Sequence, residues 1–306
     1  MHKVELEELQ KRLNESGETQ ISLTDPDSRV MTTGKHGNDV CYNAQIAVDA
    51  KHKLIIAHDL TNEANDLHQL VPMAQAAQEV LGVDHLDVTA DKGYYNETQI
   101  AQCEQDNISC YIPEQEKSQN KALGLYTDRD FHYDALNDCY RCPANEQLTK
   151  RSETIKGNKH VKIYETSACK QCQLRAQCTR SRTSNRRIYR WVHEHVIEAM
   201  RERMMRYPGK AIQRKELVEH PFAILKRWMN HDYFLMRGKE KVAAEFSMSL
   251  LVYNMKRVLN ILGVPTLIAV LRALSGEVLS FLVRLVRRRV YFTNGVLSNN
   301  IACLTA

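Results

Sequence analysis

Long apolar runs and an excess of glycine or proline are missing from the 306-residue sequence. No uninterrupted apolar stretch reaches about 18 residues, so a membrane span is not expected. The start, MHKVELEELQ, is acidic and amphipathic, unlike the basic and then apolar start of a secretory signal. With 12 Gly, 7 Pro, 43% hydrophobic and 26% charged residues, a collagen-like or low-complexity chain is excluded. A cytoplasmic globular protein of one large or two ordinary domains is predicted.

The net charge of +5 hides an asymmetry between the two halves of the chain. Residues 1–140 contain 11 Lys and Arg against 25 Asp and Glu, whereas residues 141–306 contain 31 against 12. An acidic half joined to a basic half predicts a surface on the second half that faces a polyanion. The alternative is a basic face that is only solvated.

Hydrophobic spacing predicts an ordered first third. Residues 4–16 have helical spacing, and from Cys41 the apolar side chains alternate, which predicts a strand with one buried face over 42–48. Asp49–His52 reads as a turn, and residues 54–60 as a second, more fully buried strand.

A helix with Asp66 as its cap follows, and residues 86–90 then form a strand that runs directly into Asp91. A helix over 97–105 and a short strand over 110–113 complete a mixed sheet with helices packed on it. Catalytic side chains in such sheets tend to lie at the carboxyl ends of strands, which is the position of Asp91.

The predicted fold is mixed α/β, and the predicted segments differ in composition. They are an N-terminal helix and loop (1–40), a first sheet-containing part (41–113), a linker with a cysteine-rich insert (114–190), a helical part (191–262) and an amphipathic tail (263–306) whose last residues look disordered.

Asp91 and Glu219 are acidic residues in apolar surroundings. Burial of an unpaired carboxylate costs several kcal/mol, and converging carboxylates form an oxygen-rich site for Mg²⁺ or Mn²⁺. Two such ions about 4 Å apart promote phosphodiester cleavage. The alternative makes Asp91 a helix cap and Glu219 a residue at the boundary of an apolar stripe.

Three segments together carry a family resemblance: residues 41–73 (CYNAQIAVDAKHKLIIAHDLTNEANDLHQLVPM), 88–96 (VTADKGYYN) and 214–228 (RKELVEHPFAILKRW). In this order they resemble the DDE-type transposases of bacterial insertion sequences, within the group that has a cysteine-containing insert before the catalytic Glu. The resemblance covers about residues 20–262. It implies an RNase H-like core that uses Mg²⁺ to nick transposon ends and join them to target DNA, in a homo-oligomer when intact, and no membrane partner.

The resemblance assigns roles residue by residue. Asp91 matches the second Asp of the family and Glu219 its Glu, and Lys226 matches the Lys seven positions after that Glu. Ile212 and Lys215 occupy the Tyr and Arg positions of the family signature. Lys215, together with Arg214, is expected to supply the positive charge that holds DNA phosphates.

The first Asp of the family has no clear counterpart. Asp25 and Asp27 lie in a TDPD turn and Asp49 in a hairpin turn, so each is predicted to be a turn residue. The interpretation is an N-terminally truncated transposase that is inactive alone. A non-catalytic DNA-binding remnant is the alternative function.

Five of the nine cysteines fall within 40 residues. Cys139-x₂-Cys142 and Cys169-x₂-Cys172, 26 residues apart, predict a structural Zn²⁺ site, and Cys178 is a possible substitute ligand.

The stretch from Arg180 to Arg237 is basic. Arg186 and Arg187 are predicted to contact DNA phosphates, and Tyr189 and Trp191 to stack on unpaired bases. A solvated helix with its aromatic side chains packed inward is the alternative.

Overall fold

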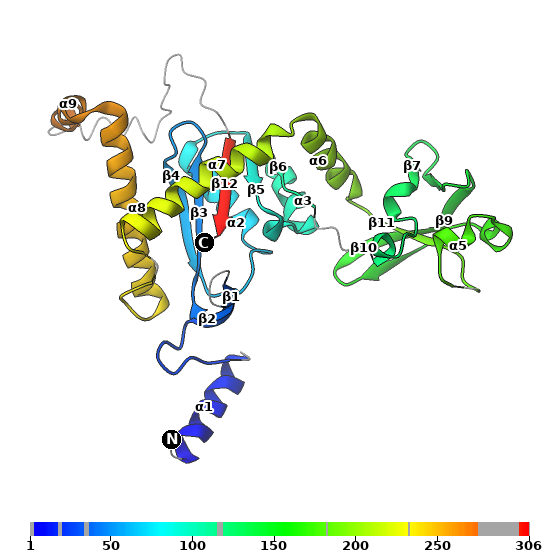
Figure 1. The fold of residues 1–306 in the computed structure, drawn as a ribbon, viewed down its shortest axis with the longest axis horizontal. Coiled ribbons are helices and arrows are strands. Elements are labelled where there is room, and N and C mark those ends of the chain that lie inside the picture. Colours follow the sequence, from blue (N-terminus) through cyan, green and yellow to red (C-terminus); the bar gives the residue numbers. More distant parts are fainter. Residues whose placement is uncertain are drawn as a thin grey trace. The chain divides into compact units, whose positions relative to one another are not determined.

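The computed structural model describes residues 3–17, 20–33, 37–114, 119–181, 183–231, 233–274 and 300–305. The chain divides into two compact units. Unit 1 comprises Met1–Pro113 and Met200–Ala306, and unit 2 comprises Glu114–Ala199. Helices and strands alternate along the chain, so the predicted mixed α/β class is confirmed (Figure 1).

Unit 1 is built on a five-stranded mixed sheet. Its strands lie in the order β4 (Ile55–Thr61), β3 (Asn43–Asp49), β12 (Asn300–Thr305), β5 (Leu86–Ala90) and β6 (Ile108–Tyr111). β12 pairs antiparallel with β3 and parallel with β5. The final residues, expected to be disordered, therefore form the central strand, between two strands that lie far upstream in the sequence.

Helices cover both faces of this sheet. Ala44, Ile46 and Val48 of β3 pack against α8 (Lys239–Leu262), and α2 (Leu70–Leu81) contacts β3, β4, β5 and β12. Every residue from Ala44 to Asp49 is buried. The expectation that this strand has one buried face is therefore wrong, because both faces of the sheet are covered here.

The second strand of the hairpin also differs from expectation. β4 lies at the edge of the sheet, and its His58 and Asp59 are exposed, so it is not the more fully buried strand. Charged and polar side chains are typical of an edge strand because they oppose pairing with another chain. The helix of residues 97–105 is confirmed as α3 (Glu97–Gln105), with Asn96 accepting hydrogen bonds as its cap.

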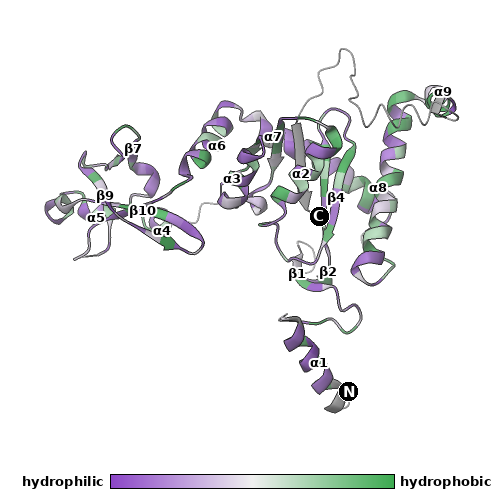
Figure 2. Ribbon diagram, turned by 180° about the vertical axis from the view of Figure 1, so that it is seen from behind, coloured by the Kyte–Doolittle hydropathy of each residue, from purple (hydrophilic) through white to green (hydrophobic). Residues whose placement is uncertain are grey.

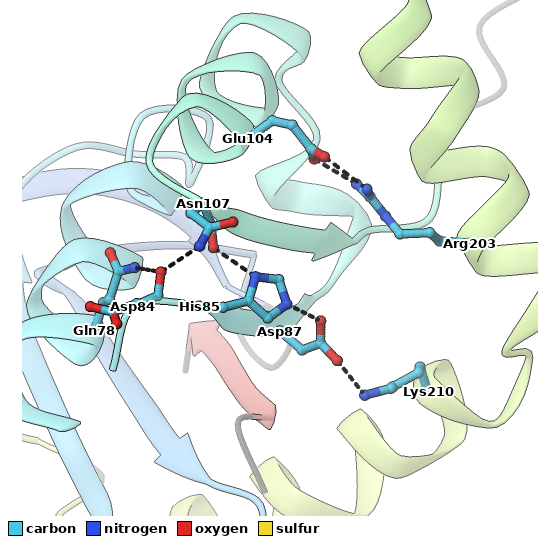
Figure 3. A network of polar contacts seen from close by, with 8 residues as sticks. All are labelled: Gln78, Asp84, His85, Asp87, Glu104, Asn107, Arg203 and Lys210. Carbon is cyan, nitrogen blue, oxygen red and sulfur yellow. Dashed lines mark hydrogen bonds and ion pairs between the residues drawn. The ribbon is translucent and has the colours of Figure 1, made fainter. Parts of the chain in front are cut away.

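Two ion pairs tie residues of the last turn of α6 and the first turn of α7 to the β5–β6 side of the sheet (Figure 3). Arg203 of α6 (Glu194–Arg206) donates two hydrogen bonds to Glu104, at 2.9 and 2.8 Å. Lys210, near the start of α7 (Gly209–Ala223), lies 3.2 Å from Asp87 of β5, and Asp87 also lies 3.4 Å from His85. These contacts set the position of α7, which carries Glu219.

A π-helical turn, η4 (Ile224–Trp228), interrupts the regular helix after α7. Pro221 lies inside α7 and has no N–H to donate, which favours a local break in the hydrogen-bond ladder. The wider turn changes the register, so residues beyond it do not continue the face of α7 on which Glu219 lies.

The remaining elements of unit 1 are simple. The predicted N-terminal helix is confirmed as α1 (Lys3–Ser16), and β1 (Arg29–Thr33) forms an antiparallel hairpin with β2 (Gly37–Cys41). Figure 2 shows α1 as almost wholly hydrophilic and α9 (Val264–Leu274) as largely hydrophobic. Among the described residues no single helix is long and apolar enough to cross a membrane, and only α8 and α9 together, bent by 106°, pass that test.

Unit 2 contains its own antiparallel sheet, where the sequence predicted only a linker and an insert. The order is β11 (Arg187–Trp191), β10 (Lys159–Glu165), β9 (Gln147–Lys156), β8 (Cys139–Arg141) and β7 (His132–Asp134). Two short helical segments, α4 (Gln119–Ala122) and η2 (Asp128–Asp130), precede β7, and two more, η3 (Ser167–Gln171) and α5 (Arg175–Cys178), lie between β10 and β11. The core is small and aromatic, comprising Phe131, Tyr140, Leu148, Tyr164 and Ile188.

Candidate functional site

Asp91 lies where the sequence predicted it, directly after β5. Its side chain caps the short helix η1 (Lys92–Tyr94), because Oδ1 accepts a hydrogen bond of 2.6 Å from the Gly93 N–H. The cap explains why the strand ends here, and it fixes one carboxylate at the carboxyl end of a buried parallel strand.

A second carboxylate, from Asp66, lies beside Asp91. A Cβ placed on Gly93 would come within 2.8 Å of Asp91 Oδ1 and 3.2 Å of Asp66 Oδ2, so the two oxygens flank one small space that only glycine leaves open. Asp66 does not cap α2 as expected, since that helix begins at Leu70 after Gln69. Its carboxylate faces the sheet instead.

Two amides of β3 hold Asp66 in place. Asn43 Nδ2 donates to Asp66 Oδ1 at 2.8 Å, and Gln45 Nε2 donates to the same oxygen at 3.0 Å. Gln45 is fully buried, and its own carbonyl oxygen accepts from the hydroxyl of the equally buried Tyr94. This network orients the carboxylate from behind, as the ligand residues of a metal site are oriented.

Glu219 does not join this pair. Its side chain is 68% exposed, and its partner is Lys215, four residues earlier, at 3.8 Å. Lys215 thus flanks Glu219 as expected, whereas Lys226 lies within the π-helical turn η4, 5.8 Å from the centre of the Phe222 ring. In the described part of the chain, no three His, Cys, Asp or Glu side chains are arranged to hold a metal ion.

The other candidate carboxylates have partners of their own. Asp25 is buried and accepts hydrogen bonds from the Tyr42 hydroxyl and the Gly238 N–H, while Asp27 accepts from the Lys239 N–H. Burial raises the pKa of Asp25, but the hydrogen bonds outweigh it and hold the pKa below its ordinary value. Asp25 and Asp27 therefore tie an N-terminal turn to the start of α8, which is more than the turn role predicted for them.

Asp49, the third of these carboxylates, behaves as the sequence predicted. It is the last, buried residue of β3, and its Oδ2 accepts a hydrogen bond of 2.6 Å from the His52 N–H across the hairpin turn.

Several of the basic residues expected at DNA are engaged within unit 2. Arg190 is 7% exposed, pairs with Glu198 at 2.6 Å and stacks 3.6 Å over the Tyr133 ring. Arg186 pairs with Asp128 at 2.5 Å, and Arg187 with Glu165 at 2.9 Å. Of these three side chains Arg187 is the most exposed, at 48%.

The aromatic residues of this stretch divide in the same way. Trp191 is buried at 7% exposure and packs inward, whereas Tyr189 is 41% exposed and lies under the ammonium of Lys156, 4.7 Å from its ring centre. In unit 1, Arg214 of α7 is half-buried. An outward basic and aromatic surface in unit 2 therefore centres on Tyr189 and Arg187.

Four cysteines of unit 2 line one pocket: Cys142, Cys169, Cys172 and Cys178. Cys139 is not among the lining residues and is buried at 2% exposure in β8. The four cysteines at this pocket therefore differ from the two Cys-x₂-Cys pairs that the spacing suggested as zinc ligands.

A comparison with protein-family models finds a transposase DDE domain at residues 133–259, which is less than half of the chain. The match supports a DDE-type transposase. It supports DNA transposition as the process and DNA as the partner, and no curated protein and no solved structure matches the chain.

The range matched to the DDE transposase domain contains Glu219 and the pocket cysteines, whereas Asp91 and Asp66 precede it. Sequence reasoning found Asp91 from its place after a strand. It missed Asp66, because an Asp before a helical stretch has the pattern of a cap. Gln45 was missed because a polar residue in an alternating strand is expected to face solvent.

Proposed function

We propose that this chain binds transposon-end and target DNA and, in place of the inactivity predicted from the sequence, carries out Mg²⁺-dependent nicking of the ends and strand transfer, with Asp91 and Asp66 as cation ligands. The observation that carries the proposal is the juxtaposition of these two carboxylates beside Gly93, at the carboxyl end of β5. The strand order β4-β3-β12-β5-β6, with one antiparallel and one parallel neighbour for β12, supports an RNase H-like core.

The residues present fit a hard divalent cation. Carboxylate oxygens are among the donors that Mg²⁺ prefers, and Asp66 and Asp91 supply them, whereas the Gln45 oxygen is engaged by the Tyr94 hydroxyl. The missing Cβ of Gly93 keeps space open between the two carboxylate oxygens. Two side-chain carboxylates with the remaining positions left to water and phosphate oxygens is the usual pattern for Mg²⁺.

Each residue has a distinct part in this proposal. A bound cation supplies Lewis acidity at the scissile phosphate. Asn43 and Gln45 hold Asp66 Oδ1, which leaves Oδ2 directed toward the Gly93 space. The Gly93 N–H holds Asp91 Oδ1, so both carboxylates are oriented before a cation arrives and little reorganisation is needed.

A second candidate function, DNA binding without cleavage, is favoured by the position of Glu219. The exposed Glu219 is paired with Lys215, and among the described residues two carboxylates, and not three, are placed at Gly93. Two ligands position a cation less firmly than three. In this case the basic residues of the second half of the chain bind DNA with a strong salt dependence and leave it uncut.

The test uses a labelled duplex that spans an end of the element from which the chain comes, incubated with Mg²⁺, Mn²⁺ or EDTA. Asp91→Asn, Asp66→Asn and Glu219→Gln are compared with Asp59→Asn, which removes an exposed acid from β4 and serves as the matched control. Metal-dependent nicking that is lost in Asp91→Asn and Asp66→Asn but kept in Asp59→Asn is the expected result.

The other outcomes separate the alternatives. Nicking that persists in Asp66→Asn removes that residue from the site, and nicking that persists in Glu219→Gln removes Glu219 from the mechanism. Salt-dependent binding with no nicking in any metal supports the second candidate function.

A further inference from the structure

The cysteine pocket of unit 2 is formed by three separate pieces of chain. Cys142 opens a tight turn after β8, in which the Asn145 N–H donates to the Cys142 carbonyl at 2.7 Å. Cys169 and Cys172 lie in and directly after η3, and Cys178 is the last residue of α5. Backbone spacing alone does not bring these pieces together, because Cys142 is distant in sequence from the other three.

We propose that Cys142, Cys169, Cys172 and Cys178 form a tetrathiolate Zn²⁺ site, and that Cys139 is a core residue and not a ligand. This set differs in one member from the two Cys-x₂-Cys pairs predicted from the sequence, because Cys178 takes the place of Cys139. It goes beyond the proposed action on DNA, since it concerns how unit 2 is held together.

The donor set and its position fit zinc. Four thiolates in tetrahedral arrangement are a standard structural Zn²⁺ site, with Zn–S distances of about 2.3 Å. All four cysteines are free and half-exposed, whereas Cys139 is buried away from the pocket lining. The four cysteines line one pocket together with Arg175 and Arg186.

Two arginines are placed to support the site. Arg175 Nη1 donates to the Cys169 carbonyl at 2.7 Å, and Nη2 donates to the Ser181 and Ser184 carbonyls at 3.1 Å, so it ties η3 to the segment after α5. Arg186 lines the same pocket, and its buried Nε has no hydrogen-bond partner. A thiolate is an acceptor for that N–H and compensates for its burial.

The metal would supply what the core of unit 2 lacks. Among the described residues, its hydrophobic cluster consists of five buried side chains, and Cys142 and Cys178 pack at the edge of that cluster. Small units with little core commonly depend on a metal or disulfides for stability. Within the described residues no three such side chains converge closely enough to hold a metal, so zinc binding requires rotation of the cysteine side chains toward one another.

The first experiment uses the full chain purified with zinc and without chelators. Metal analysis is expected to give one zinc per chain, and X-ray absorption is expected to show four sulfurs at about 2.3 Å. Substitution by Co²⁺ is expected to give the absorption bands of a tetrahedral thiolate site. Less than half a zinc per chain, or a shell with fewer than three sulfurs, would overturn the proposal.

The second experiment identifies the ligands by matched variants. Cys178→Ala is expected to lose one sulfur from the coordination shell and to release its zinc to a chelator at least about tenfold faster than the wild type, whereas Cys139→Ala keeps four sulfurs and the wild-type rate. Loss of a sulfur in Cys139→Ala with an intact shell in Cys178→Ala would refute the assignment.

A third measurement does not depend on whether the variants fold. Alkylation of the wild-type chain followed by peptide mapping is expected to show Cys142, Cys169, Cys172 and Cys178 protected with zinc and modified after EDTA. Cys41, which is far from these four in the chain, is expected to react equally in both states. Equal modification of the four cysteines with and without zinc, or a disulfide among them in reduced protein, would overturn the site.

Discussion

Gly93→Ala is the single substitution that most directly tests the Asp66–Asp91 pair. The added methyl group would lie 2.8 Å from Asp91 Oδ1 and 3.2 Å from Asp66 Oδ2, closer than a Cβ ordinarily approaches an oxygen. Because the nearer atom belongs to a side chain, we expect Asp91 to rotate away while the backbone stays in place.

Two opposing effects set the size of the change in stability. Rotation of Asp91 breaks its hydrogen bond from the Gly93 N–H, and a charged hydrogen bond contributes about 1.5–3 kcal/mol. Replacing Gly by Ala restricts the unfolded chain, which stabilises by about 0.4–1 kcal/mol. We therefore expect a net loss of about 0.5–2.5 kcal/mol.

The effect on cation binding should be larger than the effect on folding, since the methyl group fills the space between the two oxygens. Urea unfolding followed by circular dichroism gives the stability, and Mn²⁺ titration followed by electron paramagnetic resonance gives the affinity, for which we expect a loss of at least about tenfold. Gly209→Ala is the matched control. No atom lies within 4 Å of its added Cβ, so it should stabilise α7 and leave Mn²⁺ affinity unchanged.

One result would refute the reasoning for Gly93. If Gly93→Ala binds Mn²⁺ as tightly as the wild type while Asp91→Asn does not, then Asp91 takes part in binding from a different position than the one described beside Gly93. If neither substitution changes the affinity, the cation binds elsewhere in the chain.

Three further predictions concern stability. Ile46→Ala, at a fully buried position of β3, should cost about 2–5 kcal/mol in urea unfolding, and a cost below about 1 kcal/mol would contradict the packing. A double-mutant cycle of Arg203→Met and Glu104→Gln should give a coupling of about 1 kcal/mol; no coupling would make the pair a solvated one. Hydrogen bonds from Tyr164 and Tyr133 lower the pKa of Asp138 to about 2, below its ordinary 3.8. Asp138 should therefore stabilise unit 2 above pH 4 and lose that contribution as the pH falls through 2, and unfolding of Asp138→Asn should lack this dependence.

The sequence predicted those elements whose pattern is local. α1 and β3 follow from apolar spacing alone, α3 and β5 were also predicted, and Asp91 follows from the end of β5. The strands of unit 2 were missed because β9 has exposed polar residues over most of its length, which hides a strand period. Asp66 was missed as a site residue, and Cys178 was predicted only as a substitute zinc ligand, for another reason. Their partners lie far away in sequence, at Gln45 and Cys142, and no local pattern reports such a contact.

The central position of β12 has a consequence for synthesis. Ile301 pairs with Asp49, about 250 residues earlier, so a ribosome that has completed β3 needs roughly 12–50 s to reach β12 at about 5–20 residues per second. Until β12 is made, the edges of β3 and β5 that will pair with it have no hydrogen-bond partner. Another strand could pair with either edge first. The yield of soluble protein should therefore depend on the speed of translation and on chaperones. The competing reaction is pairing of β3 or β5 with a strand of a neighbouring nascent chain before β12 is synthesised.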